Sequence, residues 1–145
     1  MNRKSVAMAI VAAVCLLGGN RARGEVIWYK GGAAGHNFQY GSYAGTAVGV
    51  TFGVWPVAPG HSAGAVWTTD GWRTVHWSPA QWAQNVPGSA GNLDEEWRWA
   101  ETITCTPTPA YGTQTYIWFA VYVDNQSGQR SWDNNNGWNY QLIAR

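Results

Sequence analysis

The sequence of 145 residues contains little cysteine, which excludes a fold held together by disulfide bonds. Cys15 lies in an N-terminal apolar run that we expect to be removed, so the mature chain keeps only Cys105. One cysteine cannot form an intramolecular disulfide. We therefore expect Cys105 to be a buried apolar residue, and we expect the stability of the domain to come from burial of side chains.

The sequence also has no apolar run long enough to cross a bilayer as a helix. The run Val6–Leu17 follows Arg3 and Lys4 and precedes small residues, a layout typical of a secretory signal peptide. Ala22 and Gly24 fit the −3 and −1 positions of a cleavage site, which predicts a secreted or periplasmic protein. The predicted organisation is a signal peptide over residues 1–24 and one domain over residues 25–145.

Basic residues are scarce in the predicted mature chain. Only five of the nine remain after cleavage, against all eight acidic residues, which gives a net charge of about −3. A protein that binds nucleic acid needs a basic face to neutralise phosphates. We therefore expect no nucleic-acid partner, and for the same reason no association with an anionic membrane after the signal peptide is removed.

Groups that could carry catalysis or hold a metal are few. The only dense acidic group is Asp94–Glu96 with Glu101. Adjacent residues on a strand point to opposite faces, so these residues do not provide the facing carboxylates of a glycosidase, and we expect a solvated loop and strand start. The three histidines lack zinc-ligand spacing. Asp133, Asn135 and Gly137 imitate part of a calcium loop without its closing glutamate. The sequence predicts no enzyme activity, no metal and no cofactor, with structural calcium as a minor alternative.

Aromatic residues are abundant where leucine is rare. The predicted mature chain has only Leu93 and Leu142, but it holds all 11 Trp, with seven Tyr and three Phe. Replacement of leucine by aromatic residues in the core accounts for roughly half of the rings. The others are expected at the surface, where flat exposed rings indicate a binding site.

Short runs rich in Val, Thr, Trp and Tyr alternate with clusters of Gly, Pro and Asn, a pattern that predicts a β-sandwich or barrel. Strands are expected near Val26–Tyr29, Ala47–Trp55, Ala65–Thr69, Arg73–Trp77, Trp97–Ile103, Tyr116–Asp124, Gln129–Trp132 and Asn139–Ile143. A single helical turn is expected at Ser78–Trp82, with Ser78 as cap and Pro79 at the first position. Loops are expected at Val86–Asn92 and Thr106–Thr113, and a hairpin at Asp124–Gln129.

The strand Tyr116–Asp124 shows which of its faces is buried. Its odd-numbered positions are uniformly apolar and form the predicted core face, which includes Phe119. Its even-numbered positions are aromatic or polar, as Tyr122 and Asp124 illustrate, so this face is predicted to be at least half exposed.

The segment Trp132–Tyr140, with the sequence WDNNNGWNY, carries the clearest functional signal. A sugar offers an apolar ring face, on which an aromatic ring can stack, and a rim of hydroxyls, to which amides and carboxylates hydrogen-bond. The segment supplies both kinds of group in nine residues: Trp132, Asp133, Asn134, Asn135, Asn136, Trp138, Asn139 and Tyr140. A turn that uses asparagine for left-handed backbone explains part of the motif, but a turn does not require two Trp and a Tyr.

This segment resembles the C-terminal signature of the family 21 starch- and glycogen-binding modules and their plant-type relatives. Those modules occur in fungal glucoamylases, plant starch synthases and the glycogen-targeting subunits of protein phosphatase 1. A second block, Ala65–Thr74 (AVWTTDGWRT), resembles the family's strand, aspartate turn and Trp. The two blocks lie in the expected order, so the resemblance covers roughly residues 46–143.

The resemblance implies an immunoglobulin-like β-sandwich of about seven to eight antiparallel strands that binds α-1,4-glucan without catalysis. It implies that Trp72 and Trp132 are facing stacking platforms, with Trp132 favoured over Trp138, and that Asp133 supports the turn. The carbohydrate-binding residues implied are Trp72, Trp132, Asp133, Asn134, Asn135, Trp138, Asn139 and Tyr140. The family's lysine-rich strand is replaced here by Ala47–Trp55, which argues against a second site of the family's kind.

Two other classes of protein stay open at this point. One is a lectin-like or inhibitory secreted protein that recognises another glycan or a protein partner, and the other is an envelope protein whose rings only pack. A glucan-binding module with no attached enzyme would retain starch breakdown products, attach to granules, or assist a separate secreted amylase.

Overall fold

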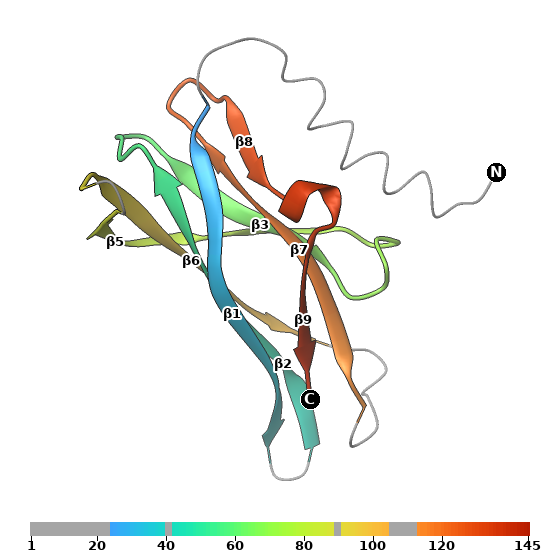
Figure 1. Ribbon diagram of the computed structural model, residues 1–145. Helices are drawn as coiled ribbons and strands as arrows, with labels where there is room; N and C mark the ends of the chain where they lie inside the picture. The colour runs from blue at the N-terminus through green and yellow to red at the C-terminus, as the bar shows by residue number, and fades with distance from the viewer. Residues whose placement is uncertain (1–23, 40–41, 89–90, 105–112) are drawn as a thin grey trace, which may run out of the picture.

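The computed structural model describes residues 24–39, 42–88, 91–104 and 113–145, and these form a β-sandwich of two antiparallel sheets (Figure 1). The predicted all-β sandwich is confirmed. Sheet A has the strand order β1-β2-β6-β5, with β1 at Val26–Gln39, β2 at Ser42–Trp55, β6 at Leu93–Ile103 and β5 at Gln81–Pro87. Sheet B has the order β4-β3-β7-β8, with β4 at His76–Pro79, β3 at Ser62–Thr68, β7 at Thr115–Asp124, β8 at Arg130–Asp133, and β9 at Tyr140–Ala144 also paired with β7.

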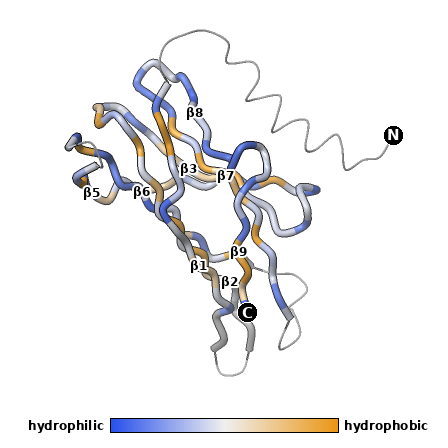
Figure 2. The backbone as a smooth tube through the Cα atoms, in the orientation of Figure 1, coloured by the Kyte–Doolittle hydropathy of each residue, from blue (hydrophilic) through white to orange (hydrophobic). Residues whose placement is uncertain are grey.

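The core lies between the sheets and is built from alternate residues of the paired strands. Phe119 of β7 is fully buried and contacts Trp99 of β6 at 5.6 Å between ring centroids. The odd-numbered residues of β7 face this core, as the alternation predicts, and Figure 2 shows the apolar character of β3 and β7 where they cross the middle of the molecule. Aromatic rings take the places that leucine usually fills in such a core.

Strands β8 and β9 lie along the same edge of β7. Residues Val121–Asp124 of β7 pair with β8, and residues Thr115–Phe119 pair with β9. The loop between them contains one turn of 3-10 helix, η1, at Asn135–Gly137, and it is hydrophilic in Figure 2. The WDNNNGWNY segment is therefore an excursion from an edge strand that is otherwise continuous.

The predicted helical turn at Ser78–Trp82 is wrong. Ser78 and Pro79 end β4, and β5 begins at Gln81. The Ser78 hydroxyl does not cap a helix because it donates to Glu101 Oε2 at 2.7 Å and accepts from Trp67 Nε1 at 2.9 Å.

Several predicted boundaries also differ. β4 begins at His76 rather than Arg73, and β5 extends to Pro87, into the predicted loop Val86–Asn92. The described part of the chain has nine strands, one more than the eight expected. The additional strand is β5, whose residues were expected to form the helical turn and the loop. Residues 1–23, Cys105 and most of the predicted loop Thr106–Thr113 lie outside the described residues.

The prediction that Asp94–Glu96 is a solvated strand start is wrong for Glu95, which is 3% exposed. Its carboxylate accepts hydrogen bonds from Trp97 Nε1 at 2.7 Å and from the Ala58 N–H at 3.0 Å, and it lies 3.0 Å from His61 Nδ1. Buried carboxylates require such partners. Glu95 thus fixes the connection between β2 and β3 onto sheet A.

Candidate functional site

The outer face of sheet B carries a row of residues that the strand registers place next to one another. Gly64 of β3 pairs with Tyr122 of β7, and Tyr122 pairs with Trp132 of β8. Trp77 of β4 pairs with Val66 of β3, one step farther along the same face. The four strands thus bring three aromatic residues from distant parts of the chain to one surface.

These three rings, Trp77, Tyr122 and Trp132, form one aromatic cluster. The centroid distances are 5.5 Å for Trp77–Tyr122, 5.7 Å for Trp77–Trp132 and 5.4 Å for Tyr122–Trp132. The planes meet at 53–66°, so the rings form a faceted surface and not one flat platform. Trp77 is 53% exposed, and Trp132 is partly exposed, which leaves apolar ring area open to a ligand.

Gly64 makes room for this cluster. A Cβ atom at position 64 would lie 2.5 Å from Tyr122 Oη and 2.6 Å from the Ser78 carbonyl oxygen. Any larger residue would therefore push the Tyr122 ring off the sheet or break the pairing of β3 with β4. Because position 64 is glycine, the Tyr122 side chain can lie close against β3 and contact Trp77.

Arg130 links the rings to a carboxylate. Its guanidinium lies 4.1 Å from the Tyr122 ring centroid, 5.3 Å from that of Trp77 and 5.7 Å from that of Trp132. Two of its N–H groups donate to Asp124 at 2.6 and 2.7 Å, and this hydrogen bond raises the pKa of Arg130 above its ordinary value. The remaining N–H groups of the guanidinium can donate to hydroxyls of a ligand seated on the rings.

Asp133 anchors the WDNNNGWNY loop to the core. Its carboxylate accepts hydrogen bonds from the Tyr29 N–H at 2.9 Å, the Tyr140 hydroxyl at 2.9 Å and the Asn135 N–H at 3.2 Å. Burial of the Tyr140 ring, followed by its bond to Asp133, raises the pKa of Tyr140 well above its ordinary value. Tyr140 packs on Phe119 at 5.5 Å, so the structure places it as a support of the loop, and Asp133 has the turn-supporting role that was predicted.

The asparagines largely hold the shape of the loop. Asn135, Asn136 and Asn139 have φ angles of 53°, 55° and 59°, in the left-handed region that asparagine tolerates better than most residues. Asn134 Oδ1 accepts the Gly137 N–H at 3.0 Å, and Asn135 Nδ2 donates to the Asn139 carbonyl at 3.1 Å. Asn139 Oδ1 is buried without a hydrogen-bond partner among the described residues. Only the asparagine amide groups that do not take part in these hydrogen bonds are available to contact a ligand. That they do so stays a prediction.

Trp138 and Trp132 lie in different surroundings. Trp138 is 75% exposed at the end of the η1 loop, whereas Trp132 is held within the aromatic cluster. A ring fixed by neighbours loses less conformational freedom on binding than a ring that projects into solvent. This difference supports the preference for Trp132 as the main platform.

Trp72 lies in the connection between β3 and β4, beyond the end of β3 at Thr68. Its φ angle of 66° is unusual for a bulky residue and costs about 1–3 kcal/mol. The conformation is held because the Trp72 N–H donates to Thr68 Oγ1 at 3.2 Å. Thr68 pairs with Trp118 of β7, four residues along the strand from the Tyr122–Trp132 pair, or about 14 Å away. That Trp72 and Trp132 serve one ligand stays a prediction.

Asp70 fixes the turn that carries Trp72. Its Oδ1 accepts hydrogen bonds from the Thr68 hydroxyl at 2.8 Å and from the Arg73 and Thr74 N–H groups at 3.0 and 2.9 Å. Burial alone would raise the pKa of Asp70, but these hydrogen bonds outweigh it and lower the pKa to about 2. The ionised carboxylate is therefore part of the turn's structure.

Acidification is expected to loosen this turn and to mobilise Trp72. Because the folded-state pKa lies below the unfolded value, the stabilisation is complete above about pH 4 and is lost as the pH falls through about 2. The Trp72 indole N–H signal in NMR spectra should shift or broaden in this window. In Asp70→Asn the step should be absent, and a step that persists in this variant would contradict the assignment.

Two members of the cluster, Trp77 and Tyr122, were not predicted as binding residues. Alternation along Tyr116–Asp124 does place Tyr122 on the outer face, which is a usable signal. The prediction that this face is at least half exposed is wrong, because Ala120 is buried and Tyr122 is only partly exposed. The position of Trp77 could not be inferred because the start of β4 was predicted three residues too early, and because strand pairing is not visible in the sequence.

Two antiparallel sheets packed face to face define the class as an all-β sandwich, and one of the sheets carries an exposed aromatic cluster. The fold is similar to the solution structure of the carbohydrate-binding module of the muscle glycogen-targeting subunit of protein phosphatase 1, with a TM-score of 0.52 and 19% sequence identity over 81% of this chain and 74% of that one. This similarity confirms the predicted resemblance at the level of the fold. The sequence matches no family model and no curated protein.

Proposed function

We propose that this chain is an exported, non-catalytic module that binds α-1,4-glucan, such as starch, glycogen or maltooligosaccharides, on the outer face of sheet B. The observation that carries the proposal is the aromatic cluster of Trp77, Tyr122 and Trp132 with Arg130 beside it. The open ring surfaces stack on the apolar faces of sugar rings, and the guanidinium donates to their hydroxyls.

The arrangement of the carboxylates supports a non-catalytic role. Glu95 is buried and engaged with His61 and Trp97, and Glu96 is paired with Lys30 and Arg98 on sheet A. Asp124 is bound to Arg130, and Asp133 supports the loop. Each of these carboxylates has a structural partner, so none of them is free to act as the acid or nucleophile of a glycosidase. Export rests on the predicted signal peptide. No helix in the described ranges has the length and apolar character needed to cross a membrane.

The proposal predicts binding that is selective for α-linked glucans. Tryptophan fluorescence and calorimetry with maltoheptaose, β-cyclodextrin and soluble starch should show saturable binding, whereas cello-oligosaccharides and laminarin-type β-glucans should bind weakly. A change in the Trp77 indole N–H signal during the titration would place the ligand on sheet B.

The control is Leu93→Ala, because Leu93 is 54% exposed on sheet A and so matches Trp77 in exposure. This variant should bind as the wild type does. Binding of a β-glucan or another glycan with no response to any α-glucan would contradict the proposal and favour a lectin-like protein with a different partner.

A further inference from the structure

The outer face of sheet A contains a second row of residues in register across all four strands. Trp28 of β1 pairs with Gly53 of β2, Gly53 pairs with Glu96 of β6, and Glu96 pairs with Gln84 of β5. We call these four residues the Trp28 row. The neighbours of Gly53 in β2, Phe52 and Val54, are fully buried in the core, so the row faces outward.

Trp28 lies directly over Gly53. A Cβ atom at position 53 would lie 2.3, 2.4 and 2.9 Å from Cζ2, Cε2 and Nε1 of the indole. The glycine thus leaves the space that the ring occupies, and the sheet supports one side of the ring. The Trp28 side chain is only partly buried, so some of its surface is exposed to solvent. A fixed ring on a rigid strand is the form of platform that loses little entropy when a ligand stacks on it.

Polar groups lie beside this ring. The Glu96 carboxylate accepts hydrogen bonds from Arg98 at 3.0 Å, Gln84 at 3.3 Å and Lys30 at 3.3 Å. Lys30 is the extra residue at a register shift between Tyr29 and Gly31, and it reaches the same face as Trp28. The Arg98 hydrogen bond, foremost among these contacts, lowers the pKa of Glu96.

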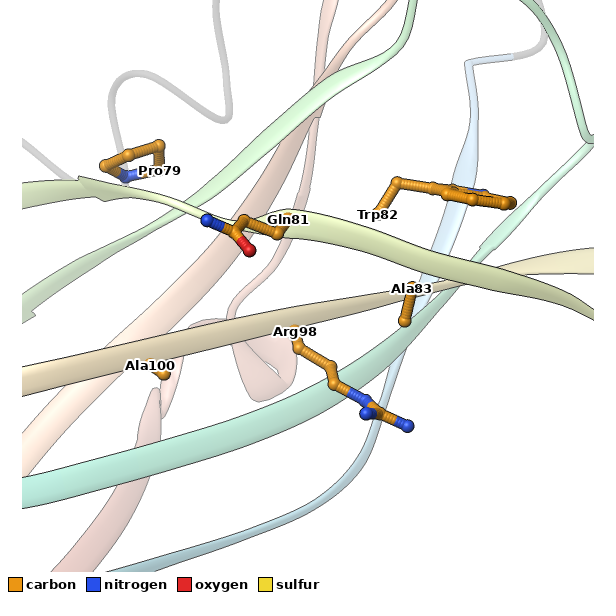
Figure 3. Close-up of a pocket in the computed structure, with 6 residues that line it drawn as sticks. All are labelled: Pro79, Gln81, Trp82, Ala83, Arg98 and Ala100. Carbon is orange, nitrogen blue, oxygen red and sulfur yellow. The ribbon is translucent and has the colours of Figure 1, made fainter.

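The Trp28 row borders a hollow in the surface of sheet A. Beside Arg98 lies a hollow of about 390 Å³, lined also by Gln81, Ala83 and Ala100 (Figure 3). Trp82 also lines this hollow, and in this view its ring and the Arg98 side chain lie on opposite sides of β5. The small side chains of Ala83 and Ala100 leave room for a ligand that continues past Glu96.

We propose that the Trp28 row is a second glycan-binding site, separate from the aromatic cluster, and that it takes a neutral glucan segment. The ring supplies a stacking surface, while a carboxylate, an amide and a guanidinium supply planar hydrogen-bonding groups for adjacent hydroxyls. Lys30 and Arg98 are both paired with Glu96, so the three side chains together carry one net positive charge. Three strand spacings, about 14 Å, separate Trp28 from Gln84, which exceeds one sugar ring and fits an oligosaccharide.

This second site extends the proposed function and rests on it for the class of ligand. The two sites lie on the outer faces of opposite sheets, so one short oligosaccharide cannot occupy both. A long polymer, however, offers segments to many molecules, and each molecule can then join two glucan chains. The wild type is therefore expected to cluster glycogen particles, as divalent binding allows.

The test follows the indole N–H signals of Trp28 and Trp77 separately during titration with maltoheptaose. Both should shift and saturate. Trp28→Ala should lower the affinity at the sheet A site on the order of tenfold, as expected for loss of a stacked ring. Gly53→Ser keeps Trp28 but displaces its ring, and it should have a similar effect.

The matched control is Gly35→Ser, because a Cβ atom at position 35 of β1 meets nothing within 4 Å. This variant should bind maltoheptaose and cluster glycogen as the wild type does. Light scattering should show that Gly53→Ser loses clustering while its Trp77 signal still responds.

The outcomes separate the two proposals. If Trp77 responds but Trp28 does not, and Gly53→Ser clusters glycogen normally, the second site is overturned and the site on sheet B stands. If Trp28 responds and Trp77 does not, the site on sheet B is overturned. If neither signal responds, both proposals fail.

Discussion

Maltoheptaose is expected to bind the Trp132→Ala variant about ten to a hundred times more weakly than the wild type at the sheet B site. Trp132 contacts both other rings of the aromatic cluster, so its removal takes away its own stacking surface and leaves Trp77 and Tyr122 each with one packed neighbour fewer. Loss of one stacked ring costs about 1–3 kcal/mol by analogy with ring stacking on bases, and tenfold corresponds to about 1.4 kcal/mol.

The affinity of this variant should be measured from the Trp77 indole signal, so that binding at the proposed sheet A site does not contribute to the measured value. Trp132→Phe keeps a ring at the position and should retain most of the affinity, which separates the loss of stacking from a change in fold. Circular dichroism and thermal unfolding should show that Trp132→Ala is still folded. Unchanged affinity in a folded Trp132→Ala protein would contradict the proposal that the aromatic cluster is the binding site.

The Asp133→Ala variant is expected to lose about 3 kcal/mol of unfolding free energy. The substitution leaves the Tyr29 N–H and the Tyr140 hydroxyl without their acceptor, and both are partly buried. A buried donor without a partner costs about 1–3 kcal/mol. Urea unfolding should show a lower midpoint, and the loop containing η1 should lose protection in hydrogen exchange.

Two variants test the cause of this loss. Asp133→Asn keeps one acceptor oxygen and should be destabilised less than Asp133→Ala. Tyr140→Phe removes the hydroxyl, so the double variant with Asp133→Ala should be less destabilised than the sum of the two single changes. A loss below about 1 kcal/mol in Asp133→Ala would mean that the loop is held by its asparagine turns and not by its attachment to the core.

Trp132 and Asp133 show how one short motif serves two purposes. They are adjacent on β8 and therefore point to opposite faces of sheet B. Trp132 joins the exposed cluster, while the Asp133 carboxylate reaches Tyr29 of the other sheet and Tyr140. Strand alternation thus directs one of these two adjacent side chains to the exposed cluster and the other to the anchor of the loop.

Much of this could be predicted from local patterns. Alternation in Tyr116–Asp124 gave the two faces of β7, and the buried state of Phe119 follows from it. The shape-holding role of the asparagines also follows from their tolerance of left-handed backbone. Such features depend on neighbouring residues in the chain, so they can be inferred without knowledge of the fold.

The errors arose where a residue's role depends on a distant partner. Ser78 and Pro79 have the local chemistry of a helix start, but Trp67 and Glu101 engage the Ser78 hydroxyl, and the segment becomes strands. Glu95 has the local chemistry of a solvated residue, but His61 and Trp97 meet it in the interior.

The sequence by itself determined the all-β class, the abundance of rings beyond what a core needs, and the one segment in which rings and amides are concentrated. The tertiary structure alone decided which rings share a surface. Trp77 lies beside Trp132 only because β4, β3, β7 and β8 pair in that order within one sheet. Trp28 lies over Gly53 only because β1 pairs with β2 in that register. Register is fixed by which residues are buried across the whole sandwich, and the contacts that fix it are far apart in the chain.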